Sequence, residues 1–211
     1  MSAVKSLRLG PRSEATLEDR GVLVTGAARR IGAAIVTRLH ENGARVAIHC
    51  RQSVHDAESL ADRLNQLRPD SAAVFTADLG RVDNCTSLVS AAVDWGGRLD
   101  GLVNNASSFY PTPMGSVTEE QWEDLFSSNL KGPFFLAQAA MDPLRSAKGS
   151  IVNLVDIHSQ RPLRNHPVYG SAKAGLAMLT RALAKDLAPR IRVNGISPGA
   201  ILWPEDGLDP E

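Results

Sequence analysis

The chain has 211 residues, of which 43% are hydrophobic and 22% charged, and its 23 basic side chains balance its 23 acidic ones. This composition is typical of a globular protein that is large enough to bury one full hydrophobic core. Because the net charge is zero, the chain has no global basic field for nucleic acid or an anionic membrane, and we expect neither partner.

After residue 20, short apolar runs alternate with longer amphipathic ones. The predicted strands are residues 21–25, 45–49, 72–76, 99–104, 150–154 and 191–196. The predicted helices are residues 31–42, 54–68, 82–94, one long helix within 119–144 that Thr118 caps, and 169–187. This alternation predicts a single α/β domain over residues 20–211. Its fold is a Rossmann-like, doubly wound parallel sheet with helices on both faces.

The segment between the first strand and the first helix predicts a phosphate-binding turn. It reads TGAARRIG over residues 25–32, and a glycine there lets backbone N–H groups approach a pyrophosphate at the helix N-terminus. The two glycines are six residues apart, which departs from G-x-G-x-x-G, and ordinary turn chemistry is the alternative. The predicted contacts are Gly26, Arg29, Arg30 and Ile31.

The end of the second strand predicts which dinucleotide binds. NAD sites carry an Asp or Glu at this point for the ribose 2′-hydroxyl, whereas residues 49–53 read HCRQS. A guanidinium and a hydroxyl group would hold a 2′-phosphate, and Arg29 or Arg30 could reach the same phosphate. The sequence therefore predicts NADPH over NADH, with contacts from His49, Arg51 and Ser53. The alternative is that Arg51 is a solvated loop residue.

Two further segments suit a nucleotide. Asp78 and Leu79 follow the third strand, where an acid can accept a hydrogen bond from the adenine amino group. Asn105, Ala106 and Ser107 follow the fourth strand, at the carboxyl end where ligands bind in open α/β sheets. An Asn-Asn pair after a strand is also a common turn, so these residues indicate a site only together with the others.

The segment YGSAK (residues 169–173) supplies a candidate catalytic pair. Tyr169 and Lys173 are one helical turn apart on the same face. A phenol holds its proton at neutral pH because its pKa is about 10, and nearby positive charge favours the phenolate once the proton has left. Asp156 stands at the end of the preceding strand. Asn129 is a polar residue on an apolar helical face, and it could hold a water between Lys173 and solvent. The alternative is a buried tyrosine beside a surface lysine.

TGAARRIG, NNAS, the helical Asn129, YGSAK and the Pro198-Gly199 pair together resemble the short-chain dehydrogenase/reductase family over about residues 20–203. The resemblance implies that Tyr169 is the proton donor and that Lys173 binds the nicotinamide ribose and lowers the pKa of Tyr169. It further implies that Asn129 supports a proton relay, that Pro198 and Gly199 line the nicotinamide pocket, and that the protein is a homotetramer.

One departure from the usual family pattern indicates a particular subgroup of the family. Most members of the family have Ser where this chain has Asp156, whereas Asp at this position resembles the pteridine reductases, as does an arginine at the Arg30 position. That subgroup implies a pterin or folate substrate stacked on Phe109, with Ser107, Asp156 and Tyr169 completing the substrate site. To deliver a proton near neutral pH, Asp156 would need a raised pKa. The alternative is that Asp156 only anchors a different substrate.

Two other functions fit the same residues. One is a carbonyl or 3-oxoacyl reductase of the same family, since Tyr169 and Lys173 serve both reactions. The other is a non-catalytic NADPH-binding protein.

The chain ends and the cysteines carry weaker expectations. Residues 1–19 lack the apolar middle of a secretory signal, and no run approaches the ~20 apolar residues of a membrane span. Cys50 and Cys85 lack metal-ligand spacing, so no metal site is expected. We expect a cytoplasmic protein with a flexible arm over residues 1–19. Members of the family usually continue well past the Trp203 position, so a C-terminal part is expected to be missing.

Overall fold

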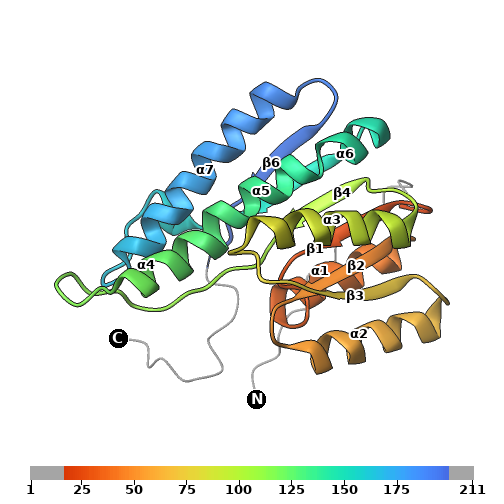
Figure 1. Cartoon of the computed structure of the whole chain (residues 1–211), viewed down its shortest axis with the longest axis horizontal. Helices are drawn as coiled ribbons and strands as arrows, with labels where there is room; N and C mark the ends of the chain where they lie inside the picture. The colour runs from red at the N-terminus through yellow and green to blue at the C-terminus, as the bar shows by residue number, and fades with distance from the viewer. Residues whose placement is uncertain (1–16, 200–211) are drawn as a thin grey trace, which may run out of the picture.

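A computed structural model describes residues 17–199, and the flexible arm predicted for residues 1–19 falls almost wholly outside this range. Its centre is a six-stranded sheet in which every neighbouring pair is parallel, in the order β3-β2-β1-β4-β5-β6. The strands are β1 (Gly21–Val24), β2 (Arg45–Cys50), β3 (Ala72–Thr76), β4 (Gly101–Asn104), β5 (Ser150–Leu154) and β6 (Arg192–Ile196). The predicted Rossmann-like fold class is confirmed (Figure 1).

Helices connect the strands in the predicted order (Figure 1). The helical segments are α1 (Arg30–Glu41), α2 (Val54–Leu67), α3 (Val82–Gly96), α4 (Glu119–Phe126), η1 (Ser127–Lys131), α5 (Gly132–Ala139), α6 (Met141–Ala147), η2 (Ile157–Ser159) and α7 (Pro167–Leu187). No helix in the described range is long and apolar enough to cross a membrane. That range also holds no cluster of three or more metal-ligating side chains.

The long helix predicted within residues 119–144 is present: α4, η1 and α5 follow one another without a gap from Glu119 to Ala139, and α6 is a separate helix. The sequence did not predict the π-helical stretch η1 or the break before α6. Two prolines lie at these points, and a proline has no N–H to donate to the carbonyl four residues earlier. Pro133 leaves the carbonyl of Asn129 without its α-helical partner inside η1, and Pro143 does the same to Ala139, where α5 ends.

The start of this region is as predicted. The Thr118 hydroxyl accepts a hydrogen bond from the Gln121 amide (3.3 Å), and the Gln121 side chain accepts one from the Thr118 amide (3.1 Å). This capping box satisfies two backbone donors at the start of α4.

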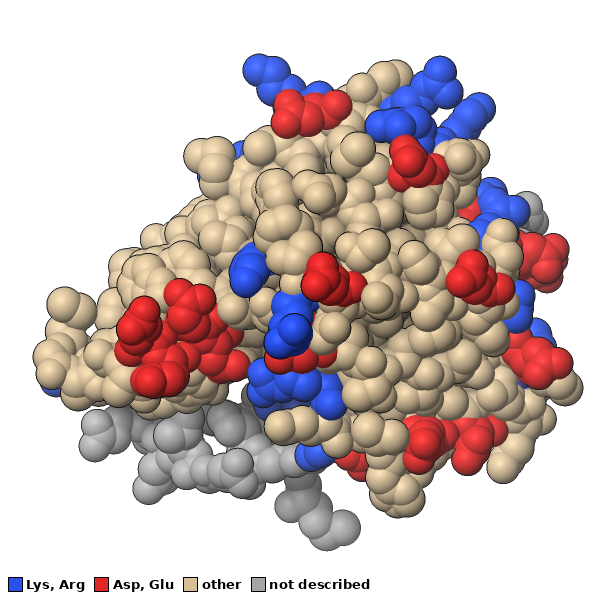
Figure 2. Space-filling model, in the orientation of Figure 1, with Lys and Arg blue, Asp and Glu red and all other residues tan. Residues whose placement is uncertain are grey.

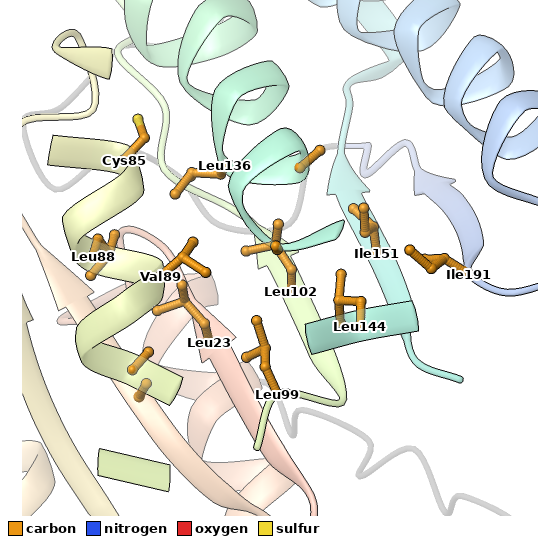
Figure 3. Close-up of a cluster of buried hydrophobic side chains, with 14 of the residues drawn as sticks. Leu23, Cys85, Leu88, Val89, Leu99, Leu102, Leu136, Leu144, Ile151 and Ile191 are labelled. Atoms are coloured by element: carbon orange, nitrogen blue, oxygen red, sulfur yellow. The ribbon is translucent and has the colours of Figure 1, made fainter. Parts of the chain in front are cut away.

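The two faces of the sheet carry separate cores, because side chains alternate along each strand. On one face, Leu23, Leu102 and Ile151 pack against α3, α5 and α6 (Figure 3). On the other face, Val24 and Ile48 pack against α1 and α2. The sheet is thus covered by helices on both sides, which leaves its strand ends as the place where polar side chains can gather.

Asp100 ties down the amino-terminal end of the sheet. Its carboxylate is only 8% exposed and accepts hydrogen bonds from Arg20 (2.7 Å), from Arg98 (2.7 and 2.6 Å) and from the Gly21 amide (3.0 Å). Burial by itself would raise the pKa of Asp100, but the hydrogen bonds from Arg98, Arg20 and Gly21 outweigh it and lower that pKa. Asp100 therefore stays charged and joins the starts of β1 and β4.

We expect Asp100→Asn to lower the free energy of unfolding by about 1–3 kcal/mol at pH 7, because two guanidinium groups lose their charged partner. A lowered carboxyl pKa contributes stability that is present above its ordinary value of 3.8 and is lost as the pH falls through the folded-state pKa. The gap between wild type and variant should therefore shrink on acidification. Urea unfolding at several pH values measures it.

Asp142→Asn is the matched control, since Asp142 forms an exposed ion pair with Arg145 on α6. Exposed pairs of this kind contribute about 0–1 kcal/mol. If both variants lose the same stability with the same pH dependence, the role assigned to Asp100 is wrong.

Candidate active site

A cleft of about 740 Å³ opens at the carboxyl ends of the strands. The strand order reverses between β1 and β4, and this is the crevice where open α/β sheets bind ligands. The structure brings most of the predicted site residues into its wall. They are Gly26, Arg29, Arg30, Ile31, His49, Arg51, Ser53, Asp78, Leu79, Asn105, Ala106, Ser107, Phe109 and Tyr169.

The glycine turn packs closely against the end of β4. Gly26 has φ +59°, and a Cβ there would lie 2.7 Å from the Cα of Ala106. A Cβ on Gly32 would lie 2.3 Å from the carbonyl oxygen of Gly26. The Asn105 side chain donates to the carbonyls of Thr25 and Gly26, both at 2.9 Å. Glycine is therefore required at both positions, and Asn105 stabilises the turn itself.

The residues at this turn fit a dinucleotide pyrophosphate. Arg29, which precedes α1, makes no side-chain capping bond, and the first turn of α1 has no acidic residue. The first N–H groups of α1 thus remain available to an anion at the positive end of the helix dipole. Arg30 opens the helix with φ +50°, a left-handed conformation that favours glycine and costs an arginine about 1–2 kcal/mol.

His49 is a buried residue that hydrogen-bonds the backbone of the glycine turn. The ring is 2% exposed, its Nδ1 accepts from the Gly26 amide (3.2 Å), and its Nε2 lies 3.1 Å from the carbonyl of Ala77. Burial lowers the pKa of His49, so the imidazole is neutral, with its proton on Nε2. Of the predicted cofactor contacts, His49 therefore acts chiefly on the backbone of the turn.

The basic residues predicted for a 2′-phosphate lie at one end of the cleft, and both arginines are paired. Arg29 donates to Ser53 (2.7 Å) and forms an ion pair with Asp56 (2.7 Å). Arg51 forms an ion pair with Asp124 (3.3 Å). The sequence interpretation missed both acidic partners, and Asp124 is 73 residues from Arg51 along the chain.

The predicted catalytic residues meet at the end of β5. The Tyr169 hydroxyl donates a hydrogen bond to Asp156 (2.6 Å), whose other oxygen accepts from the His158 amide (2.8 Å). Burial and the adjacent Asp156 carboxylate raise the pKa of Tyr169. This is opposite to the lowering that the family resemblance implies. The phenol contacts an anion here, whereas Lys173 donates to the carbonyl of Leu154 (2.9 Å).

Lys173 is buried beneath Tyr169. Its side chain is 3% exposed, and its ammonium group lies 5.8 Å from the centre of the Tyr169 ring. Burial lowers the pKa of Lys173 to about 8. Pro198 and Gly199 follow β6, and the Pro198 carbonyl accepts a hydrogen bond from the Ile157 amide (3.4 Å), next to Asp156.

Asn129 is buried in η1 and is held by protein partners. Its side-chain amide donates to the carbonyls of Leu125 (3.0 Å) and Ser108 (2.9 Å), and its oxygen accepts from the Ser107 hydroxyl (2.7 Å). The side chain thus joins η1 to the loop after β4. Pro133 leaves the main-chain carbonyl of Asn129 without an α-helical donor.

Phe109 stands at the mouth of the cleft and is 48% exposed. One face stacks on His166 (centroids 4.8 Å apart, planes at 13°), and the ring packs against Tyr169 at 77°. The sequence interpretation missed His166, which immediately precedes α7. Phe109 lines the cleft and keeps about half of its surface exposed despite these two contacts.

Comparison with known proteins identifies the class. The family model described as short chain dehydrogenase matches residues 20–205. Pteridine reductase 1 of Leishmania tarentolae is 40% identical over 223 residues, which cover 87% of this chain and 77% of that protein. A protein named probable galactose dehydrogenase, from Rhizobium meliloti (strain 1021), is 39% identical over 88% of this chain and 73% of its own.

Two further relatives support the same family. A protein named putative ketoacyl reductase 2 of the granaticin polyketide synthase, from Streptomyces violaceoruber, is 37% identical over 86% of this chain and 73% of its own. A crystal structure from Sinorhizobium meliloti 1021, described as a putative short-chain alcohol dehydrogenase, superposes with a TM-score of 0.83 at 40% identity, covering 87% of this chain and 73% of that one.

The chain belongs to the short-chain dehydrogenase family. It is therefore an oxidoreductase, with NAD(H) or NADP(H) as the cofactor that the family implies and a small molecule as its substrate. The relatives act on different substrates by name, so the family alone does not choose among them.

Because Lys173 is buried, we expect the free energy of unfolding to change with pH in the alkaline range. Because the pKa of Lys173 is lowered to about 8 from 10.5, the buried charge costs the folded state stability below pH 8, and this cost shrinks as the pH rises and is gone above 10.5. We expect wild type to gain about 3 kcal/mol relative to Lys173→Met between pH 7 and 10.5. Urea unfolding of both proteins across this range measures the gain.

Lys185→Met is the control, since Lys185 is an exposed lysine near the end of the same helix. A gap between wild type and Lys173→Met that stays constant from pH 7 to 10.5 would contradict the lowered pKa.

Proposed function

We propose that this protein is an NADPH-dependent reductase that converts a dihydropterin or dihydrofolate to its tetrahydro form. The observation that carries the proposal is the 2.6 Å hydrogen bond between Tyr169 and Asp156, beside the half-exposed ring of Phe109. A flat, nitrogen-rich ring suits the exposed aromatic ring of Phe109, and its amino and ring N–H groups suit a carboxylate. The 40% identity to a pteridine reductase supports the same substrate class.

In this proposal Tyr169, Asp156 and Lys173 carry out the proton transfer. Reduction of a C=N bond adds a hydride to carbon and a proton to nitrogen, and a bound reduced nicotinamide supplies the hydride. Tyr169 stays protonated because its pKa is raised, so it holds the proton to be donated. Asp156 accepts the Tyr169 hydrogen bond and is half-buried, so it can pass a proton between the phenol and the substrate. Lys173 places a positive charge beneath the phenol, which stabilises the phenolate after transfer.

Preference for NADPH rests on the end of β2. No acidic residue occupies residues 49–53, whereas Arg51, Ser53 and Arg29 gather at that end of the cleft. Carboxylates at Asp56 and Asp124 already contact these arginines, so the preference depends on how readily they exchange partners. Asp78 lies at the same end, within the cleft wall, for an adenine amino group.

A second candidate is a carbonyl or 3-oxoacyl reductase. The 39% and 37% identities to a probable galactose dehydrogenase and a ketoacyl reductase favour it, and a protonated Tyr169 would serve a ketone equally well. For either reaction we propose a homotetramer. Large apolar side chains exposed on α4, α5 and α7 (Trp122, Phe134 and Met178) support association.

Replacing Asp156 with Ser separates the two candidates. We expect Asp156→Ser to lower kcat/KM for a dihydropterin about 10²-fold or more, because the carboxylate that anchors the ring and passes the proton is gone. Ketone reduction should persist, because Tyr169 and Lys173 remain. NADPH consumption over dihydropterin, dihydrofolate and ketone substrates measures both effects. A wild-type protein that reduces ketones but no dihydropterin would decide for the second candidate.

Arg51→Ala tests the cofactor. We expect the variant to lose about tenfold in kcat/KM for NADPH and little for NADH, because a charge-assisted bond to the 2′-phosphate is removed. Arg38→Ala is the control, since Arg38 forms an exposed pair with Glu41 on α1. Wild-type preference for NADH, or an equal loss with both cofactors, would contradict the proposal.

A further inference from the structure

One ion pair crosses the cleft at the end assigned to the 2′-phosphate. Arg51 follows β2, Asp124 lies in the middle of α4, and their side chains meet at 3.3 Å across the cleft wall that both residues form. The two side chains are 52% and 31% exposed, so this ion pair is in contact with solvent. The carboxylate thus comes from α4, while the guanidinium comes from the segment that follows β2.

Asp124 is held in place by other bonds. Its second oxygen accepts a hydrogen bond from the Tyr110 hydroxyl (3.1 Å), and its backbone carbonyl accepts one from the Ser128 hydroxyl (2.9 Å). Partial burial and the Asp124 charge raise the pKa of Tyr110, which keeps that hydroxyl a donor. Asp124 is therefore a fixed acceptor rather than a mobile surface acid.

The setting of Asp124 differs from that of its acidic neighbours. Acidic side chains gather over α4, next to basic side chains near the centre of the view (Figure 2). Glu123 also lines the cleft and is exposed, but within residues 17–199 only Asp124 on this helix forms an ion pair with Arg51. A charge change at Glu123 is thus a matched control for the same change at Asp124.

We propose that Asp124 is a specificity-determining residue that restrains the binding of an adenosine 2′-phosphate by Arg51 and so sets the strength of the coenzyme preference. The inference rests on the proposed use of NADPH. The present contact uses one of the five N–H donors of the guanidinium. A 2′-phosphate must either displace Asp124 or share Arg51 with it. Displacement loses an ion pair, and sharing places two anions on one cation, so both routes weaken phosphate binding.

Cofactor fragments test the inference without any reaction. The probes are 2′,5′-ADP, which carries the 2′-phosphate, and 5′-AMP, which lacks it, and calorimetry measures their Kd values. We expect Asp124→Asn to bind 2′,5′-ADP about three- to tenfold more tightly at low salt, since one negative charge near the phosphate is removed. Binding of 5′-AMP should stay within about twofold. Asparagine keeps the shape of the side chain and can still pair with Tyr110.

Controls distinguish the effect of the Arg51–Asp124 ion pair from the effect of any lost negative charge near the cleft. Glu123→Gln should tighten 2′,5′-ADP binding less than Asp124→Asn does, and in an Arg51→Ala background Asp124→Asn should lose most of its effect. High salt should reduce the gain, because exposed charges are screened. If Asp124→Asn proves too unstable to assay, Asp124→Ser removes the same charge, and Tyr110→Phe reports the lost hydrogen bond alone.

The outcomes are distinct. Unchanged or weaker binding of 2′,5′-ADP by Asp124→Asn overturns the inference, because Asp124 would then be neutral or would orient Arg51 for the phosphate. If wild type binds both probes equally but Asp124→Asn prefers 2′,5′-ADP, the role of Asp124 stands and the NADPH preference of the wild type fails. If neither protein prefers 2′,5′-ADP, both proposals fail.

Discussion

The close packing of the Gly26 turn against the end of β4 is the contact on which the site depends. A side chain at Gly26 would strike the backbone of Ala106, and one at Gly32 would strike the carbonyl of Gly26. Because neither position carries a side chain, β1, the turn and α1 can follow one another closely. The N-terminus of the helix then faces the crevice between β1 and β4. Asn105 and His49 then stabilise the same turn from two sides.

Tyr169 and Lys173 have shifted pKa values without any ligand. Lys173 is almost fully buried with a carbonyl as its hydrogen-bond acceptor, and the Tyr169 hydroxyl donates to a carboxylate. Burying a charged lysine lowers stability, and shifted pKa values of this kind are common at functional sites. The sheet offsets this at its opposite end, where Asp100 is surrounded by donors and contributes only to the fold.

Much of the fold could be predicted because each strand is a short apolar run between turn residues, and this pattern is local. The region after Thr118 could not be read in the same way. Apolar periodicity continues through it, but Pro133 and Pro143 remove single backbone donors, and the chain responds with a π-helical turn and a break. Periodicity reports which face is buried, whereas hydrogen-bond geometry decides whether the helix is continuous.

The alternation of strands and helices, the glycine turn and the Tyr169–Lys173 spacing could be recognised from the amino-acid order alone, because each depends on residues within one or two turns of the chain. Which side chains face one another is fixed by how the chain folds in three dimensions. Arg51 meets Asp124, Phe109 stacks on His166, and Asn129 joins two loop residues. These contacts join segments far apart in the chain, and their partners are chosen by the parallel strand order, which no local pattern encodes.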